Sequence, residues 1–302
     1  KKSGVTMHYQ KELISFIKNK KQEQGVISTN IPTLRFYITN EPSEFTSIIY
    51  EPSICIALQG EKAVGFGDEM YSYNQDKYLL ASTHIPANVK ISEASVEKPY
   101  VALIINFTLE QIYDVIKETK ENTIINRKNI QKSLCFSPLD DSLLEPILRL
   151  VKLTTKEENI TFLSNLVLKE IIYILLQQNG DFLKQHVLEG NLTNQIVKAI
   201  TEIKNNYSDT INMKELSKTI GISESSLYQN FKKITSMSPL QFQKKIRLEE
   251  AKQMLVSQNI EASQVAFVVG YESPSQFSRE YSRMFGMSPK AHCDFIRNQD
   301  IA

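Results

Sequence analysis

The pattern of apolar and polar positions divides the chain into a β-rich first part and a helical remainder. Between residues 34 and 107, short runs of β-branched and aromatic residues alternate with turn clusters. Runs of this length are typical of antiparallel strands in a barrel or sandwich. We expect strands at residues 34–38, 53–58, 62–66, 78–82, 89–92 and 100–107.

Helical periodicity flanks this β region. It predicts an amphipathic helix at residues 8–21 and three more helices at 109–118, 142–153 and 160–178. The last of these is apolar on much of its circumference. We therefore expect it to be buried, either under the barrel or against a second copy of the chain.

The C-terminal part carries one short pattern twice, because Met-Ser-Pro at residues 237–239 recurs fifty residues later at 287–289. Upstream of each copy a glycine precedes a serine, an apolar residue and an aromatic residue, the last two each four positions on. These residues are Gly221, Ser223, Leu227 and Phe231, and then Gly270, Ser273, Phe277 and Tyr281. Two tandem helix-turn-helix units are typical of a DNA-binding domain with two recognition helices.

A long helix is predicted to join the two units. It starts at Pro239, with Ser238 and Gln241 as a capping box, and runs to about Ser257. At about 1.5 Å per residue its length is about 28 Å, close to the roughly 34 Å of one turn of B-DNA. Ser273 and Gln276 predict a second capping box. Further helices are expected at 195–206, 213–220, 224–234, 261–269, 274–285 and 289–298.

The exposed faces of the recognition helices supply candidate DNA contacts. Glutamine and arginine can form paired hydrogen bonds with adenine and guanine, and lysine suits phosphate. The candidate base contacts are Glu224, Ser225, Tyr228, Gln229, Pro274, Ser275, Ser278 and Arg279. The candidate phosphate contacts are Lys232, Lys233, Lys244, Lys245 and Arg283. The alternatives are an all-α packing module and, for Arg247, a pair with an acid inside the packing.

Length and charge fit this division. A chain of 302 residues accommodates two domains. We expect an N-terminal domain at 1–188, with the barrel at about 30–107 and helices at about 109–187, a linker at 189–194, and the DNA-binding domain at 195–302. The net charge is +1 for the chain and +3 from residue 195 onward, which is a weak nucleic-acid signal.

The sequence also indicates a compartment. No run approaches eighteen apolar residues, and residues 1–25 lack the apolar centre of a signal peptide. Cys55, Cys135 and Cys293 are scattered and odd in number, which fits a reducing cytoplasm rather than a disulfide framework. We expect a cytoplasmic protein without a membrane partner.

The residues from 195 to 297 resemble the DNA-binding domain of the AraC/XylS family of bacterial transcription regulators. The resemblance is carried by Leu216-Ser217, Gly221-Ile222-Ser223, Leu227, Phe231-Lys232-Lys233, Arg247-Leu248-Glu249-Glu250-Ala251, Ala266, Gly270-Tyr271, Phe277, Arg279, Phe285-Gly286 and Ser288-Pro289. Ser217 stands where the family usually has alanine.

The N-terminal part resembles, less closely, the effector or dimerisation domain of one branch of that family, through residues 50–53, 59–62, 67–69 and 169–173. The resemblance implies a cupin-like barrel that binds a small effector or forms a dimer. Barrel residues that could line such a pocket are Arg35, Tyr37, Tyr71, Tyr73 and Tyr78. The alternative for each is a filled core, because only about half of strand side chains point inward.

A cupin-type enzyme is the other class considered. Such enzymes hold a metal with clustered histidines, whereas His8, His84, His186 and His292 are not paired at ligand spacing. We expect no metal, no cofactor and no catalysis, and we interpret the three cysteines as structural, with Cys135 as a candidate redox sensor.

The expected fold class is therefore α+β, with a cupin-like antiparallel barrel followed by two helix-turn-helix units joined by a long helix. The expected partners are double-stranded promoter DNA, RNA polymerase, and a small-molecule effector or a second copy in a homodimer. A regulator controlled by a protein partner or by its own level, without a ligand, is the competing hypothesis.

Overall fold

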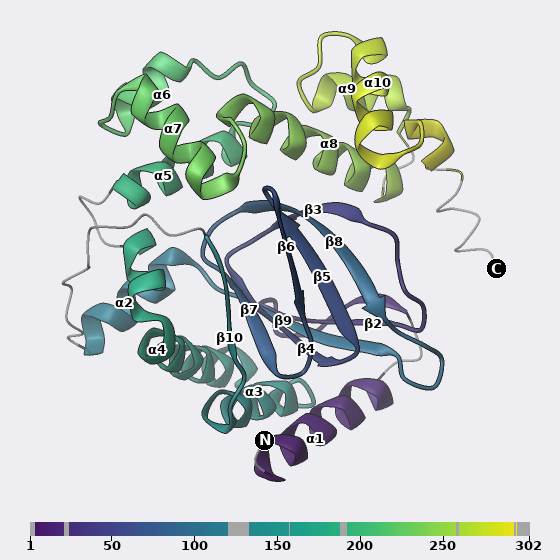
Figure 1. Ribbon diagram of the computed structural model, residues 1–302, viewed down its shortest axis with the longest axis vertical. Helices are drawn as coiled ribbons and strands as arrows, with labels where there is room; N and C mark the ends of the chain where they lie inside the picture. Colours follow the sequence, from purple (N-terminus) through teal and green to yellow (C-terminus); the bar gives the residue numbers. More distant parts are fainter. Residues whose placement is uncertain are drawn as a thin grey trace.

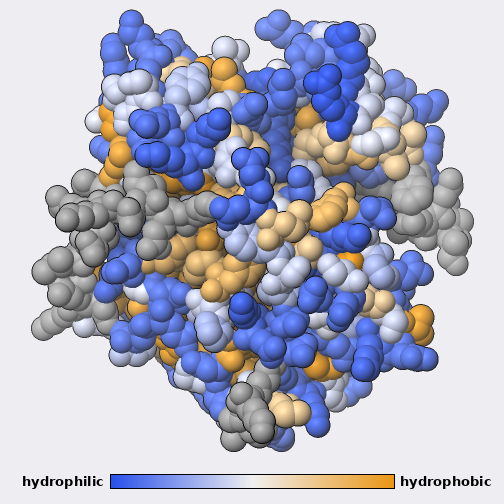
Figure 2. Space-filling view, viewed as in Figure 1, coloured by the Kyte–Doolittle hydropathy of each residue, from blue (hydrophilic) through white to orange (hydrophobic). Residues whose placement is uncertain are grey.

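The computed structural model describes residues 4–20, 24–119, 133–156, 158–187, 192–257, 260–292 and 294. Two β-sheets form the centre of the molecule, helices cover the outer side of one sheet, and the C-terminal helices lie across the end of the sheets (Figure 1). Hydrophilic side chains predominate over the C-terminal helices at the top of the view in Figure 2.

Both sheets are antiparallel. The first has the order β1 (Gly25–Ser28), β2 (Leu34–Thr39), β9 (Tyr100–Asn106), β4 (Ser53–Gln59), β7 (Lys77–Ala81) and β10 (Leu134–Pro138). The second has the order β3 (Thr46–Tyr50), β8 (Ile85–Glu93), β5 (Glu61–Phe66) and β6 (Glu69–Tyr73). The six predicted strands are confirmed, and β1, β3, β6 and β10 were not predicted.

The six-stranded sheet buries both of its faces. In β2, Leu34 and Phe36 pack against the helices, whereas Tyr37 packs toward the second sheet. In β9, Leu103 packs against the helices and Tyr100 packs toward the second sheet. This alternation follows from the two-residue repeat of a strand, and it decides which side chains can reach the space between the sheets.

The helical layer consists of α1 (Gly4–Lys20), α2 (Leu109–Thr119), α3 (Asp141–Leu153) and α4 (Ile160–Val187). Helix α4 extends nine residues beyond the predicted end, past a non-helical residue at Asn179 that accepts a hydrogen bond from Ser137 Oγ at 2.7 Å. The apolar side of α4 packs into the core with α3, so the first of the two expected positions is confirmed.

Helix α4 is, among the described residues, the one helix long and apolar enough to meet the length and composition of a membrane span. Its packing is that of a core helix, because Ile171, Ile172 and Leu175 are at most 1% exposed. Its outer side mixes exposed polar residues with Phe162 and Leu166.

The C-terminal part is helical, with α5 (Leu192–Asn205), α6 (Met213–Thr219), α7 (Glu224–Thr235), α8 (Pro239–Ser257), α9 (Ala262–Val268) and α10 (Pro274–Phe285). Residues 192–194 belong to α5, so this part of the predicted linker is wrong, and residues 188–191 lie outside the described residues. The expected helix at 289–298 is confirmed at residues 289–292, whereas residue 293 and the residues from 295 onward lie outside the described residues.

The capping boxes differ. Ser238 and Gln241 form the expected reciprocal pair, with backbone-to-side-chain distances of 3.0 and 3.3 Å. At α10, Ser273 Oγ accepts from Gln276 N, but the Gln276 side chain donates to Glu280 instead of reaching back. The second box is therefore only half formed, because the hydrogen bond from Gln276 Nε2 to the Glu280 carboxylate holds the Gln276 side chain along α10.

His186 anchors the end of α4 to the first sheet. Its Nδ1 lies 2.8 Å from the Phe182 carbonyl oxygen, and its Nε2 lies 3.0 Å from Ser82 Oγ and 3.1 Å from Ser133 Oγ. The ring is 0% exposed. Burial lowers the pKa of His186 to about 4, although the Phe182 carbonyl acts in the opposite direction.

This burial predicts a pH dependence of stability. The folded state holds His186 neutral, whereas the unfolded chain takes up a proton below about pH 6.5. The neutral His186 ring therefore contributes fully to the free energy of unfolding above pH 6.5. Roughly 3 kcal/mol of this contribution is lost as the pH falls to about 4. Urea unfolding should show a shallower acid slope for His186→Gln than for the wild type. The exposed-site control His8→Gln should keep the wild-type slope; equal slopes for all three proteins contradict the prediction.

Candidate nucleic-acid interface and effector cavity

The first recognition helix, α7, is capped by Ser223, whose Oγ accepts from Ser226 N at 3.2 Å. Leu227 and Phe231 are both 0% exposed, and Phe231 packs edge-on against Phe242 of α8 with ring centroids 5.4 Å apart. The opposite side of the helix is exposed. It carries the four predicted base contacts Glu224, Ser225, Tyr228 and Gln229.

The second recognition helix, α10, repeats this arrangement. Phe277 and Tyr281 are each 1% exposed and face the core of the second unit. Ser275 and Arg279 are exposed, and the other two predicted base contacts, Pro274 and Ser278, are half-buried.

The predicted phosphate contacts divide into two groups. Lys232, Lys233 and Arg283 are exposed and form no ion pair with an acid among the described residues, so they remain candidates. Lys244 is exposed but forms an ion pair with Glu280 at 3.0 Å. Lys245 is only partly exposed, and burial lowers its pKa to about 8, although the charge of Glu249 acts in the opposite direction.

Arg247 holds the two helix-turn-helix units together. Its Nε donates to the Tyr207 carbonyl at 2.6 Å, and its Nη1 donates to the Gly270 carbonyl at 2.7 Å. Its Nη2 donates to the carbonyls of Ser208 and Asp209 at 3.2 and 3.0 Å. The expected role inside the packing is correct, but the partners are backbone carbonyls rather than an acid.

Gly270 allows the backbone at Ser208 to lie close to the second helix-turn-helix unit. Its φ is +90°, and a Cβ atom there would collide with the Ser208 carbonyl. The repeated glycine of the sequence pattern is thus required in the second unit by both backbone conformation and space.

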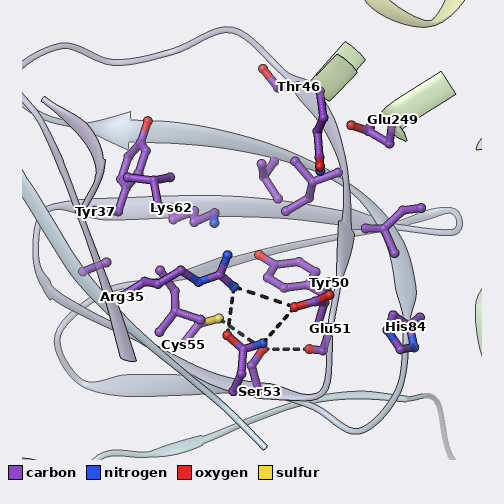
Figure 3. A pocket seen from close by; sticks show the side chains of 18 of the residues that line it. Arg35, Tyr37, Thr46, Tyr50, Glu51, Ser53, Cys55, Lys62, His84 and Glu249 are labelled. Atoms are coloured by element: carbon purple, nitrogen blue, oxygen red, sulfur yellow. Dashed lines mark hydrogen bonds and ion pairs between the residues drawn. The ribbon is translucent and has the colours of Figure 1, made fainter. Parts of the chain in front are cut away.

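A cavity of about 960 Å³ lies between the sheets and opens toward the C-terminal helices (Figure 3). Most of its wall comes from the barrel. Helix α8 closes part of it with Ile246, Glu249, Glu250, Lys252 and Gln253, and α5 contributes Lys204.

Three of the five predicted pocket residues, Arg35, Tyr37 and Tyr73, line this cavity. Tyr78 does not, because its position in β7 places it on the helix-facing side, where its hydroxyl donates to Gln178 and accepts from Asn179. Tyr71 is also not in the cavity wall: its ring stacks on Phe136 with centroids 5.0 Å apart.

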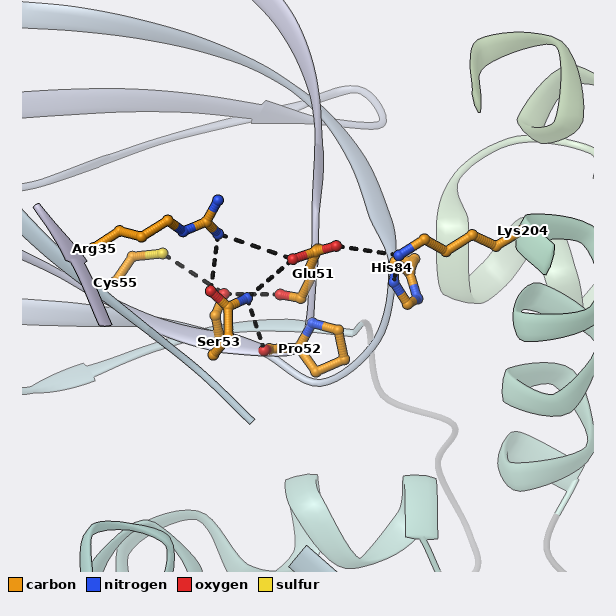
Figure 4. A network of polar contacts seen from close by, with 8 residues as sticks. Arg35, Glu51, Pro52, Ser53, Cys55, His84 and Lys204 are labelled. Carbon is orange, nitrogen blue, oxygen red and sulfur yellow. Dashed lines mark hydrogen bonds and ion pairs between the residues drawn. The ribbon is translucent and has the colours of Figure 1, made fainter. Parts of the chain in front are cut away.

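An ionic network connects the cavity wall to the DNA-binding part (Figure 4). Lys204 Nζ of α5 lies 3.1 Å from Glu51 Oε1 and 2.6 Å from His84 Nε2. Arg35 Nη2 lies 3.9 Å from Glu51 Oε2 and donates to Asn106 Oδ1 at 2.8 Å. Neither Glu51 nor Lys204 was singled out from the sequence, since their partners lie far away along the chain.

The network shifts the pKa of two of its members. Burial raises the pKa of the Glu51 carboxyl, but the charge and hydrogen bond of Lys204, with help from His84 and Arg35, lower it below its ordinary value overall. Burial and the charge of Lys204 lower the pKa of His84 to about 4. At neutral pH His84 is therefore neutral and can accept from the Lys204 ammonium.

The thiols and histidines form no further centre in the described part of the chain, where no group of three or more His, Cys, Asp or Glu side chains could hold a metal. Burial raises the pKa of Cys55, and it raises the pKa of Cys135 to about 12. A thiol with a raised pKa is a poor nucleophile and a poor redox sensor. Cys293 lies outside the described residues.

Two helix-turn-helix units beside a barrel with an internal cavity define a DNA-binding regulator with a separate regulatory domain. Residues 30–181 match the family of the AraC-type transcriptional regulator N-terminus, and residues 216–292 match a helix-turn-helix domain family. The chain belongs to the AraC-type transcriptional regulators.

Related proteins agree with this assignment. The lactose operon transcription activator of Staphylococcus xylosus is 22% identical over 272 residues, which cover 89% of this chain and 93% of that protein. The raffinose operon regulatory protein RafR of Pediococcus pentosaceus is 35% identical over 97 residues, which cover 32% of this chain and 35% of that protein.

The fold is similar to that of ToxT from Vibrio cholerae. An apo ToxT variant has a TM-score of 0.63 at 10% identity, covering 89% of this chain and 100% of that one. Wild-type ToxT bound to an unsaturated fatty acid has a TM-score of 0.61 at 12% identity, covering 86% and 94%.

Proposed function

We propose that this regulator binds promoter DNA through α7 and α10 under the control of a small molecule held in the barrel cavity. The observation that carries the proposal is the double role of α8. This helix joins the two recognition helices and also forms part of the cavity wall. Ligand binding in the cavity can therefore affect both helix-turn-helix units through one rigid helix, α8.

Relatives support control by a small molecule. ToxT has been solved with an unsaturated fatty acid bound, and the lactose and raffinose regulators are named for sugar operons. These names show that proteins of this type act in different metabolic settings. A regulator without any ligand remains the alternative. The size of the cavity and the polar groups set in its mainly apolar lining favour a ligand.

The barrel touches both DNA-reading units. Ile49 of β3 packs against the core of the first unit, and Gly67, in the turn after β5, lies against Ser236 at the end of α7. Helix α10 also contacts β3. We infer that this arrangement restrains the two units, and that the effector changes the restraint by shifting the populations of two arrangements.

Homodimerisation and contact with RNA polymerase complete the proposal, with the protein acting on DNA in the cytoplasm. For a dimer, α4 offers Phe162, Leu166 and Tyr173, which are 66%, 51% and 41% exposed. A dimer would pair two DNA-binding domains and raise operator affinity through effective concentration.

Selection of binding sites from a random DNA pool tests the proposal that α7 and α10 each contact DNA bases. We expect one motif with two elements about one helical turn apart, roughly 34 Å. Arg279→Ala should reduce preference in one element only and Gln229→Ala in the other, each by about 1–3 kcal/mol at the affected base pair. The exposed residue Lys218, on α6, gives a control in Lys218→Ala. Loss of preference across both elements from either single substitution contradicts the assignment.

Removing the ion pair between Lys204 and Glu51 tests whether the barrel restrains the helix-turn-helix units. Lys204→Gln abolishes the ion pair with Glu51, so it should release α5 from the barrel and raise ligand-free operator affinity by about threefold to tenfold. Lys198→Gln removes an exposed charge from the same helix and should leave the affinity unchanged. Fluorescence anisotropy with the selected operator measures both variants; unchanged or weaker binding by Lys204→Gln rejects the restraint.

A further inference from the structure

Lys62 of β5 is a cation inside the barrel without an anionic partner. Its side chain borders the cavity, and its Nζ lies 5.4 Å from the centre of the Tyr50 ring (Figure 3). Within the described part of the chain, no carboxylate lies within ion-pair distance and no acceptor takes a hydrogen bond from its ammonium group. A charge withdrawn from water without such partners is unfavourable.

Tyr50 carries a second unsatisfied group at the same place. The residue is 5% exposed, lines the cavity, and its hydroxyl is buried without a hydrogen-bond partner among the described residues. Two neighbouring donors that both lack an acceptor are rare in a folded protein, where buried polar groups are nearly always paired. Together they indicate that an acceptor is supplied from outside the chain.

The other polar groups of the barrel wall do not supply that acceptor. Glu51, the carboxylate in this part of the wall, is already bound to Arg35 and Lys204. Burial raises the pKa of the Cys55 thiol, which keeps it neutral and prevents it from acting as a counter-ion. Lys62 is therefore a cation of the inner wall without a carboxylate partner, because Glu51 already pairs with Arg35 and Lys204.

The outer wall, from α8, is different. Glu249 has one buried carboxyl oxygen without a partner, and burial raises the pKa of this carboxyl to about 7. Glu250 and Lys252 stand beside it on the same helix. An anion is therefore favoured at the inner end of the cavity, near Lys62, and a hydroxyl or another neutral polar group at the outer end, near Glu249.

Building on the proposed function, we propose that the effector is a small organic anion. Its carboxylate or phosphate group accepts hydrogen bonds from Lys62 and Tyr50, and the rest of the molecule extends toward Glu249 on α8. The cavity of about 960 Å³ is large enough for a body of several carbon atoms beyond the anionic group. Such a molecule would touch both the barrel and α8.

Matched neutral and anionic compounds test the charge requirement with the full chain. The probes are galactose with galacturonate and galactose-6-phosphate, and decanol with decanoate, measured by thermal shift and calorimetry at neutral pH. We expect at least one anion to bind more tightly than its neutral counterpart. Comparing galacturonate with galactose-6-phosphate distinguishes a carboxylate from a phosphate, and decanoate tests an apolar body.

Variants locate the anion. Lys62→Met should weaken the preferred anion by about 10- to 100-fold, because a charge-assisted hydrogen bond is lost. Tyr50→Phe removes only the hydroxyl and should weaken it by about 3- to 10-fold. Lys77→Met, at an exposed position of β7 outside the cavity, should bind as the wild type does.

The anion proposal is overturned if no anion binds better than its neutral counterpart, or if Lys62→Met keeps wild-type affinity. Operator binding is measured on the same preparations. Equal binding of the anion and its neutral counterpart in every pair, together with intact operator binding, removes the anion subsite and leaves the proposed function standing. Failure of the wild type to bind any DNA, with anion binding intact, removes the proposed function instead.

Discussion

One helix, α8, belongs to both halves of the molecule, and the rest of the structure depends on this constraint. Arg247, on one side of α8, binds four backbone carbonyls that belong to both helix-turn-helix units. Ile246 and Glu249, its neighbours on the same helix, line the cavity. Because a helix of nineteen residues is stiff, the separation of α7 and α10 and the shape of the cavity mouth cannot vary independently.

The contacts between the two halves suit a reversible arrangement. Exposed ion pairs such as that of Lys204 with Glu51 contribute about 1 kcal/mol or less to stability. The apolar contact with the core of the first unit is made by a partly buried side chain, Ile49. A ligand needs only a modest difference in affinity between two arrangements to shift such an equilibrium. The strong interactions lie within each half, where Arg247 and the two cores keep the geometry fixed.

The sequence predicted most of the DNA-binding part because its signals are local. The doubled glycine, serine and aromatic positions gave α7 and α10 with their caps and buried faces, and Pro239 marked the start of α8. The barrel was predicted where its strands are long and apolar. It was missed at short strands with mixed polarity, such as β3 and β10, which are stabilised by pairing with β8 and β7.

The cavity was only partly predictable. Tyr78 and Tyr73 look alike in sequence, yet they belong to different sheets. Tyr78 of β7, in the first sheet, packs on the helix-facing side, whereas Tyr73 of β6, in the second sheet, packs into the core between the sheets. Lys62 follows a turn at Gly60, so its sequence context is that of a solvent-exposed hairpin residue. The contact of Lys204 with His84 joins residues 120 positions apart, which no local pattern can reveal.

Hydrogen exchange of the full chain with and without its selected operator tests the coupling through α8 most directly. Binding energies that are linked must act in both directions, so DNA on α7 and α10 has to alter the cavity mouth. We predict changed amide exchange in α8, in β3 and in the turn at Glu51, besides protection of the recognition helices. Changes confined to α7, α10 and their turns, with the cavity mouth unaltered, would contradict the account.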